Sequence, residues 1–233
     1  INQCEKSLSR LDTDRIDVYL LHSINEDSSI DEQFRALEDL IRQGKILYVG
    51  VCNYQAWQII EAVGVQKSLG AQSLITAQNP YNLLNRQIET ELFPMAKSTD
   101  IGIMAYSPLG VGLLGGNYLP GQPAPKESLW GTNRKNFYYQ YMQGDVSRTI
   151  LAVKEISEEL GVTMSQLAVS WVLSHPEITL AISGADNANQ IEEVSKSVEV
   201  KLSDEHLEKL NYVSRRLRLD LDLYLGMGDT GEG

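Results

Sequence analysis

The chain has 233 residues, of which 42% are hydrophobic and 22% charged, a composition typical of a globular protein with one substantial core. Its formal net charge of −11 argues against nucleic-acid binding, because that affinity rests on Lys and Arg neutralising phosphates. No apolar run reaches the roughly 20 residues of a transmembrane helix, and the polar opening does not resemble a signal peptide. Cys4 and Cys52 have no metal-ligand spacing, so we predict no metal site and a reducing cytoplasm.

Apolar periodicity predicts helices and strands in alternation along the chain. In the first part these are a helix over 2–11, a strand over 16–21, a helix over 28–43, a strand over 46–51, a helix over 55–68, a strand over 74–78, a helix over 86–98 and a strand over 101–106. Ser29 with Glu32 fits a capping box at the start of the second helix, and Gly44 ends that helix.

The rest of the chain begins with a long irregular region over 107–143, rich in Gly, Pro, Asn and aromatic residues. After it we expect helices over 146–160 and 163–174, a strand over 178–182, helices over 187–197 and 203–217, and a flexible tail over 226–233. The alternation predicts the α/β class with a parallel sheet. A closed barrel needs eight strands and about 250 residues, so five strands fall short of closure.

Residues 110–115 satisfy the pattern G-x-G-x-x-G directly after a predicted strand. We reject a Rossmann domain, because these glycines lead into a loop and the pattern requires a helix, then a second strand with an acidic residue. Backbone amides next to glycine can still bind a phosphate group. The segment has no Walker lysine, so a nucleotide triphosphatase is not predicted.

Polar or aromatic side chains follow every predicted strand. They are His22, then Cys52 and Asn53, then Gln78 and Asn79, then Tyr106 and Ser107, then Ser183 and Gly184. In a parallel barrel these positions lie at one rim, where sites are built. The Asn53 and Gln78 amides suit recognition of a carboxamide, and Tyr106 offers a face on which a ring can stack. Against this, loops after strands usually contain polar residues, and a single histidine is more often structural than catalytic.

Several stretches, in order along the chain, resemble the aldo-keto reductase family. They are residues 11–22 (LDTDRIDVYLLH), 44–54 (GKILYVGVCNY), 78–82 (QNPYN), 106–110 (YSPLG) and 182–185 (ISGA), with Gln190 and Glu193. The resemblance implies a (β/α)8 TIM-barrel fold of which about five C-terminal βα units are present, in a domain over residues 1–225. It also implies reduction of aldehydes or ketones, small-molecule carbonyl substrates, with NADPH or NADH as the cofactor.

The resemblance assigns each site residue a role. His22 would hydrogen-bond the substrate carbonyl, and Cys52, Asn53 and Gln78 would hold the nicotinamide carboxamide. Tyr106 would stack under the nicotinamide ring. The remaining cofactor-binding residues would be Ser107 and Leu109 on the pyrophosphate path, and Gly184, Asp186, Gln190 and Glu193 at the adenosine end.

The chain departs from the family pattern in two ways. The family's tetrad also contains an Asp, a Tyr that acts as the acid and a Lys, all before the histidine segment. Only 21 residues precede His22 here, and none of their Asp, Tyr or Lys residues lies in the sequence context of the tetrad. Since the chain also begins at Ile1 and not at Met, we expect a fragment, a processed product or a piece that lacks its front. Asp186 and Asn117 stand where NADPH-dependent members often place Ser or a basic residue. A carboxylate there would repel a 2′-phosphate unless Arg134 or Lys135 compensates, so NADH stays open.

Three functional interpretations remain. The first is a carbonyl reductase whose first barrel strands lie outside this sequence. The second is a regulatory module that keeps the cofactor site without turnover, in the way that potassium-channel β-subunits, which resemble this family, are thought to couple the cofactor state to a partner. The third is an inactive remnant, whose exposed edge at Ile16–Leu21 would pair with another chain, so a homo-oligomer is among the expected states. The aromatic residues of the long loop either line a pocket or pack the loop, and we favour packing; they are Trp130, Phe137, Tyr138, Tyr139 and Tyr141.

Overall fold

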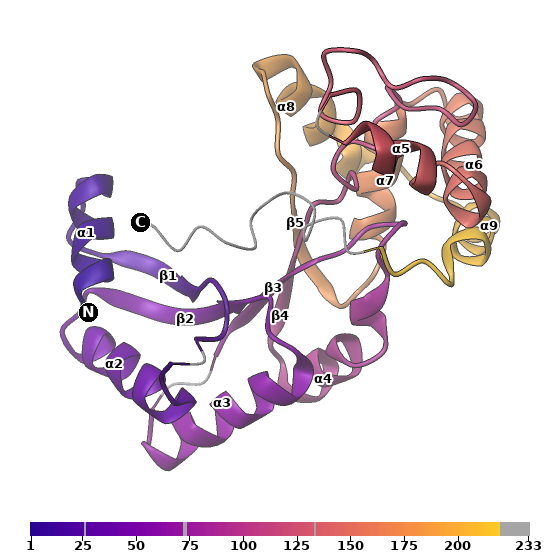
Figure 1. Cartoon of the computed structure of the whole chain (residues 1–233). Coiled ribbons are helices and arrows are strands. Elements are labelled where there is room, and N and C mark those ends of the chain that lie inside the picture. The colour runs from indigo at the N-terminus through magenta and orange to yellow at the C-terminus, as the bar shows by residue number, and fades with distance from the viewer. Residues whose placement is uncertain (26, 72–73, 133, 220–233) are drawn as a thin grey trace. The chain divides into compact units, whose positions relative to one another are not determined.

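The computed structural model describes residues 1–25, 27–71, 74–132 and 134–219 (Figure 1). These residues form two compact units. The first unit comprises residues 1–79 and 89–104, and the second comprises residues 80–88 and the chain from 105 onward. The single domain expected over 1–225 stays a prediction, and the expected tail over 226–233 lies outside the described residues.

The strands are hydrogen-bonded in the order of the chain: β1 (Ile16–Leu21), β2 (Ile46–Cys52), β3 (Thr76–Pro80), β4 (Gly102–Tyr106) and β5 (Ile178–Ile182). β1 pairs with β2 and β2 with β3 in parallel, with Ile16 opposite Ile46 and Cys52 opposite Gln78. The predicted α/β class is therefore confirmed. Parallel pairing brings the carboxyl ends of β1, β2 and β3 to the same edge.

Three helices of the first unit have the predicted positions, namely α1 (Asn2–Leu11), α2 (Ile30–Arg42) and α3 (Ala56–Ser68). α2 buries Phe34, Leu37 and Leu40, spaced along one helix face, and contacts both β2 and α3. The Ser29 side chain accepts a hydrogen bond from the Glu32 amide at 3.1 Å, which is the Ser29 half of the predicted capping box. Gly44 follows α2 with φ of 70°, as a helix-ending glycine does.

Several predicted boundaries are wrong by two or more residues: the helices expected over 187–197 and 203–217 end at Ser195 and Ser214, and the bounds of β3 and of the helix expected over 86–98 also differ. β3 was expected over 74–78 but runs two residues later, because its pairing with β2 begins at Thr76, opposite Gly50, and its end is held where the Tyr81 amide donates to Tyr106 O at 3.1 Å. The helix expected over 86–98 is divided into η1 (Gln87–Glu89) and α4 (Leu92–Thr99). Pro94 causes the division, because proline lacks an amide hydrogen and fits only the first turn of a helix.

The second unit is built around α7 (Met164–Leu173), which is buried along most of its length. α7 contacts α6 (Gly144–Leu160), β5, α8 (Ala188–Ser195) and η2 (Lys196–Glu199), and α9 (Asp204–Ser214) contacts α6. Trp171 of α7 is fully buried, stacks on Tyr81 with 5.2 Å between ring centroids, and donates from Nε1 to Asn211 Oδ1 at 3.1 Å. The Arg86 guanidinium lies 5.2 Å from the same indole. Trp171 thus joins three segments of this unit.

The long loop over 107–143 has an ordered interior and contains a helix that the sequence did not predict, α5 (Lys135–Tyr141). Trp130 and Tyr138 are buried, and they donate to Val111 O at 2.9 Å and Gln122 O at 3.0 Å. Packing is therefore confirmed for these two aromatic residues, whereas Phe137 and Tyr139 are exposed. The glycine-rich residues 110–115 form successive turns without starting a helix, in keeping with the rejected Rossmann fingerprint. Across the residues that the structure describes, no helix is both long enough and apolar enough to cross a membrane.

Candidate functional site

Four of the predicted site residues meet at the carboxyl ends of β1, β2 and β3 in the first unit. The Asn53 side chain donates from Nδ2 to the backbone oxygen of His22 at 3.1 Å, and the Asn53 amide donates to Gln78 O at 2.9 Å. The Cys52 thiol donates to Gln78 Oε1 at 3.1 Å. These bonds connect the three strand ends into one cluster, which we call the strand-end cluster (His22, Cys52, Asn53 and Gln78).

The backbone at Asn53 explains how the cluster is held. Its φ of 60° lies in the left-handed region, which Asn tolerates better than most residues with a side chain. This turn lets the residue after β2 point its amide group to the end of β1 while its backbone stays paired with β3. The backbone of His22 at the end of β1 is thereby bonded to the Asn53 side chain.

The strand-end cluster has polar but uncharged groups next to the exposed His22 side chain. Cys52 is buried, and burial raises the pKa of its thiol to about 11, so the thiol is protonated at neutral pH. Two amides, a thiol and an imidazole can donate and accept hydrogen bonds, which suits a neutral ligand such as a carboxamide. Among the described residues, no group of three or more His, Cys, Asp or Glu side chains could hold a metal ion.

Ionisation of Cys52 should make the protein less stable at alkaline pH. Because the pKa of the thiol rises from 9.0 to about 11 on folding, the stabilisation is complete below pH 9 and is lost as the pH rises towards 11. The loss amounts to about 3 kcal/mol at most. Urea unfolding between pH 7 and pH 11 should show a steeper fall for the wild type than for Cys52→Ser, and parallel curves would contradict the expectation.

Three further predicted residues lie at the end of β4 (Tyr106) and just after it (Ser107 and Leu109), in the second unit. The backbone oxygen of Tyr106 accepts from the Tyr81 amide at 3.1 Å, and that of Ser107 accepts from Asn82 Nδ2 at 2.9 Å. Ser107 has φ of 53°, which turns the chain sharply after the strand. The Leu109 oxygen accepts from the Leu114 amide at 3.0 Å and closes the following turn. The side chain of Tyr106 is half-buried.

The residues expected at the adenosine end follow β5 in the same unit. Gly184 and Asp186 are exposed. Gln190 Oε1 accepts from the Asp186 amide at 2.7 Å, and Glu193 accepts from the Thr163 hydroxyl at 2.7 Å. These bonds hold the loop after β5 to α8, and α8 to the start of α7. Gln190 and Glu193 therefore each accept a hydrogen bond from another residue of the protein.

The two basic residues considered as partners for a 2′-phosphate differ in their surroundings. Lys135 is exposed at the start of α5, as is Asn117 in the loop before it. Arg134 is only 6% exposed, and its guanidinium lies 5.6 Å from the centroid of the Trp130 ring. Arg134 is therefore part of the loop interior.

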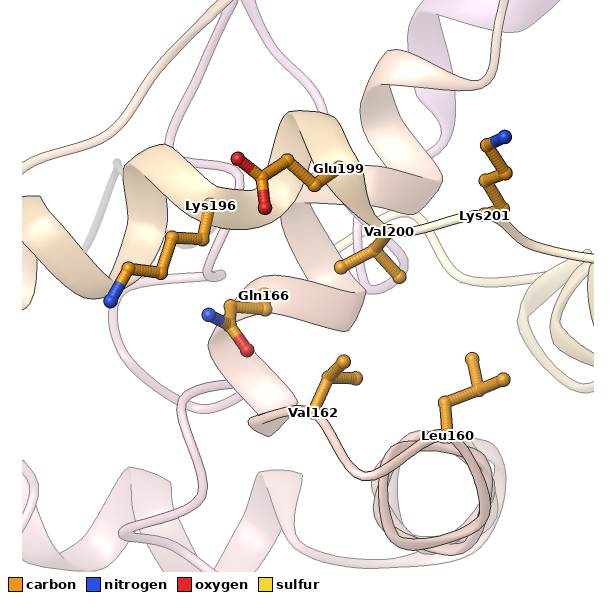
Figure 2. Close-up of a pocket in the computed structure, with 7 residues that line it drawn as sticks. All are labelled: Leu160, Val162, Gln166, Lys196, Glu199, Val200 and Lys201. Atoms are coloured by element: carbon orange, nitrogen blue, oxygen red, sulfur yellow. The ribbon is translucent and has the colours of Figure 1, made fainter.

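A surface hollow of about 370 Å³ lies elsewhere in the second unit, between the end of α6, the start of α7 and η2. It is lined by Leu160, Val162, Gln166, Lys196, Glu199, Val200 and Lys201. Figure 2 shows the two lysine side chains extending away from its centre. The Gln166 amide is bonded to Thr163 N and Glu193 O. We assign no chemistry to this hollow, because its polar groups do not converge.

Sequence reasoning gave no role to Asn82, which supports the turn after β4. Its Oδ1 accepts from the Leu84 and Asn85 amides at 2.8 and 2.9 Å, and its Nδ2 bonds Ser107 O. The signal for it was the run Asn79-Pro80-Tyr81-Asn82, since Asn and Pro together indicate a side-chain-capped turn. Asn82 therefore positions the segment that was assigned to the pyrophosphate.

Comparison with known proteins supplies the family. The sequence model of the Aldo/keto reductase family matches residues 1–215. A probable voltage-gated potassium channel subunit beta of Arabidopsis thaliana is 37% identical over 196 residues, 83% of this chain and 60% of that protein. The uncharacterized oxidoreductase YrpG of Bacillus subtilis is 32% identical, over 89% of this chain and 61% of its own length. L-glyceraldehyde 3-phosphate reductase of Escherichia coli is 29% identical, over 81% and 55%. This chain spans about 60% of the length of such relatives, and it belongs to the aldo/keto reductase family.

Proposed function

We propose that the protein is a nicotinamide-dependent oxidoreductase that reduces aldehydes or ketones to alcohols. The observation that carries the proposal is the strand-end cluster of a chain of this family, where Asn53 is bonded to the backbone oxygens of His22 and Gln78. The fold that we propose for the whole protein is a closed (β/α)8 barrel, to which the five strands of this chain contribute.

The cluster fits a nicotinamide carboxamide by the chemistry of its groups. Cys52, Asn53 and Gln78 are neutral, and between them they donate and accept hydrogen bonds. Tyr106 would stack on the ring, and Ser107 and Leu109 would follow the pyrophosphate with their turn of backbone. Gly184, Asp186, Gln190 and Glu193 would receive the adenosine. When bound, the reduced cofactor supplies the hydride.

His22 would orient the substrate by a hydrogen bond to its carbonyl oxygen. Reduction also needs a proton donor within hydrogen-bond reach of that oxygen. The family's tyrosine acid has no counterpart among the residues before His22 in this sequence. Turnover by the whole protein, its substrates and its partners are therefore part of the proposal.

Cofactor binding tests this function directly. NADH and NADPH are titrated separately into the 233-residue chain and into Gln78→Ala, with the fluorescence of the reduced nicotinamide as the readout. We expect saturable binding by the wild type and weaker binding by the variant. A wild-type chain that is folded by circular dichroism but binds neither nucleotide would refute the proposal.

Asp186 should disfavour NADPH over NADH. A carboxylate close to the 2′-phosphate repels it by about 1 kcal/mol in water, so Asp186→Asn, which removes only the charge, should tighten NADPH binding about fivefold and leave NADH unchanged. Glu208→Gln changes the net charge equally at an exposed position of α9 and serves as the control. Equal changes for both nucleotides would contradict this role for Asp186.

A regulatory module that binds the cofactor without turnover is the second candidate. The observation that favours it is the name of two relatives, the plant proteins from Arabidopsis thaliana and Oryza sativa at 37% and 35% identity, each a probable voltage-gated potassium channel subunit beta. Tight nucleotide binding with no oxidation of NADPH or NADH by a panel of aldehydes and ketones would select this candidate over the reductase.

A further inference from the structure

The side chains of Cys52 and Gln78 form a direct contact inside the strand-end cluster. The two residues are opposite one another in the parallel pairing of β2 with β3. Opposed side chains of neighbouring strands lie on the same face of a sheet, and here Sγ and Oε1 are 3.1 Å apart. Cys52 is 5% exposed and Gln78 is half-buried, so the thiol end of this contact is shielded from water.

The direction of that hydrogen bond is determined by the chemistry of the thiol. A protonated thiol has one hydrogen to donate, whereas an amide has an oxygen that accepts and a nitrogen that only donates. Burial raises the pKa of Cys52 to about 11, which keeps the hydrogen in place at neutral pH. The thiol therefore attracts the oxygen of the Gln78 amide and turns its nitrogen away. None of the described residues accepts a hydrogen bond from Gln78 Nε2.

We propose that Cys52 is a positioning residue that orients the Gln78 amide so that Gln78 meets its ligand as a hydrogen-bond donor. The inference rests on the proposed function, and it names the recognised atom: the oxygen of the nicotinamide carboxamide. An acceptor role for Gln78 towards the carboxamide nitrogen would have to use the second lone pair of an oxygen that already faces the thiol. Nε2 is turned away from the thiol and has both of its hydrogens to donate, so the donor role needs no rearrangement of the contact.

Two cofactor analogues separate the donor role from the acceptor role. The 3-acetylpyridine analogue of NADP+ keeps the ring carbonyl oxygen and replaces the amide nitrogen by a methyl group. The thionicotinamide analogue keeps the nitrogen and replaces the oxygen by sulfur, a weaker acceptor. Calorimetric dissociation constants are measured for NADP+ and both analogues with the wild type, Gln78→Ala, Cys52→Ser and Cys52→Ala.

Gln78→Ala should weaken NADP+ and the acetylpyridine analogue alike, by about two- to tenfold, the equivalent of one neutral hydrogen bond. It should change binding of the thionicotinamide analogue less. Cys52→Ser keeps a hydrogen-bond donor and should retain the wild-type ratio of the dissociation constants for the two analogues. Cys52→Ala removes the donor and should bring that ratio closer to one. The opposite pattern, in which the effect of Gln78→Ala is confined to ligands that keep the amide nitrogen, would overturn the inference.

An infrared measurement tests the contact without any ligand. The S–H stretching band of Cys52, assigned by its loss in Cys52→Ser, should lie at lower frequency than that of Cys4, which is also buried but donates to none of the described residues. In Gln78→Ala the Cys52 band should move towards that of Cys4, and an unmoved band would overturn the inference. Failure of the wild type to bind any nucleotide would instead refute the proposed function, so the two failures are distinguishable.

Discussion

Gly50→Ala should lower the free energy of unfolding by about 1–3 kcal/mol, the usual cost of an extra methyl group in a well-packed core. A Cβ atom at Gly50 would lie 2.7 Å from Thr76 Cγ2, and 3.1 Å from both Thr76 O and Leu20 Cδ2. Gly50 is opposite Thr76 in the pairing of β2 with β3, so the strands must separate to make room. Urea unfolding followed by circular dichroism measures the loss.

Two further variants show whether this crowding is the cause. Thr76→Ser removes Cγ2 and keeps the hydroxyl that donates to Gly102 O at 3.1 Å, so the double variant should lose less stability than the two single variants together. Gly64→Ala in α3 is the matched control, because a Cβ there would contact nothing. It should stabilise the protein by up to about 1 kcal/mol. Equal destabilisation at both glycines would argue against crowding.

Trp171→Ala should be the most destabilising change, at about 3–5 kcal/mol, because it leaves a large cavity in the core of the second unit. The fully buried indole stacks on Tyr81 and donates to Asn211 Oδ1. Its removal also takes away the ring beside the Arg86 guanidinium. Amide hydrogen exchange in α7 and α9 should accelerate together, since the indole bonds one helix to the other.

Trp57→Ala provides the control for this prediction. Trp57 is 56% exposed, so the same substitution should change the free energy of unfolding by about 0.5 kcal/mol or less. Trp171→Phe keeps a ring for Tyr81 and loses the bond to Asn211, and its cost should fall between those two values. A Trp171→Ala protein as stable as Trp57→Ala would show that the aromatic contacts do not support this unit.

The sequence was most informative where apolar spacing and chain-breaking residues agree. The bounds of α1, β1 and β5 follow from such patterns, and Gly44 and Ser29 mark the ends of α2 as expected. Prediction failed where backbone bonding or a ring constraint overrides hydrophobicity. Asn79 and Pro80 belong to β3, although the apolar run ends at Gln78, and Pro94 breaks a helix that periodicity alone would continue.

The candidate site was predictable as a set of strand ends, but its bonds were not. Parallel pairing explains why His22, Asn53 and Gln78 meet at one edge. The side-chain amide of Asn53 reaches the backbone oxygen of His22 because residue 53 has a left-handed backbone conformation. No periodic pattern in the sequence indicates that conformation. The packing inside the long loop was also not predictable from local sequence, because Trp130 and Tyr138 donate to backbone oxygens 16 or more positions away in the chain.

The backbone at Asn53 has a consequence for how freely this position can vary. Glycine accepts a φ of 60° but has no group to offer His22, and aspartate accepts it but would set a carboxylate against the backbone oxygen. Lysine or leucine would adopt that backbone only with strain. In a saturation library selected for folding and nucleotide binding, asparagine should therefore be enriched at position 53 far above every alternative, while an exposed helix position such as Glu61 should tolerate many residues.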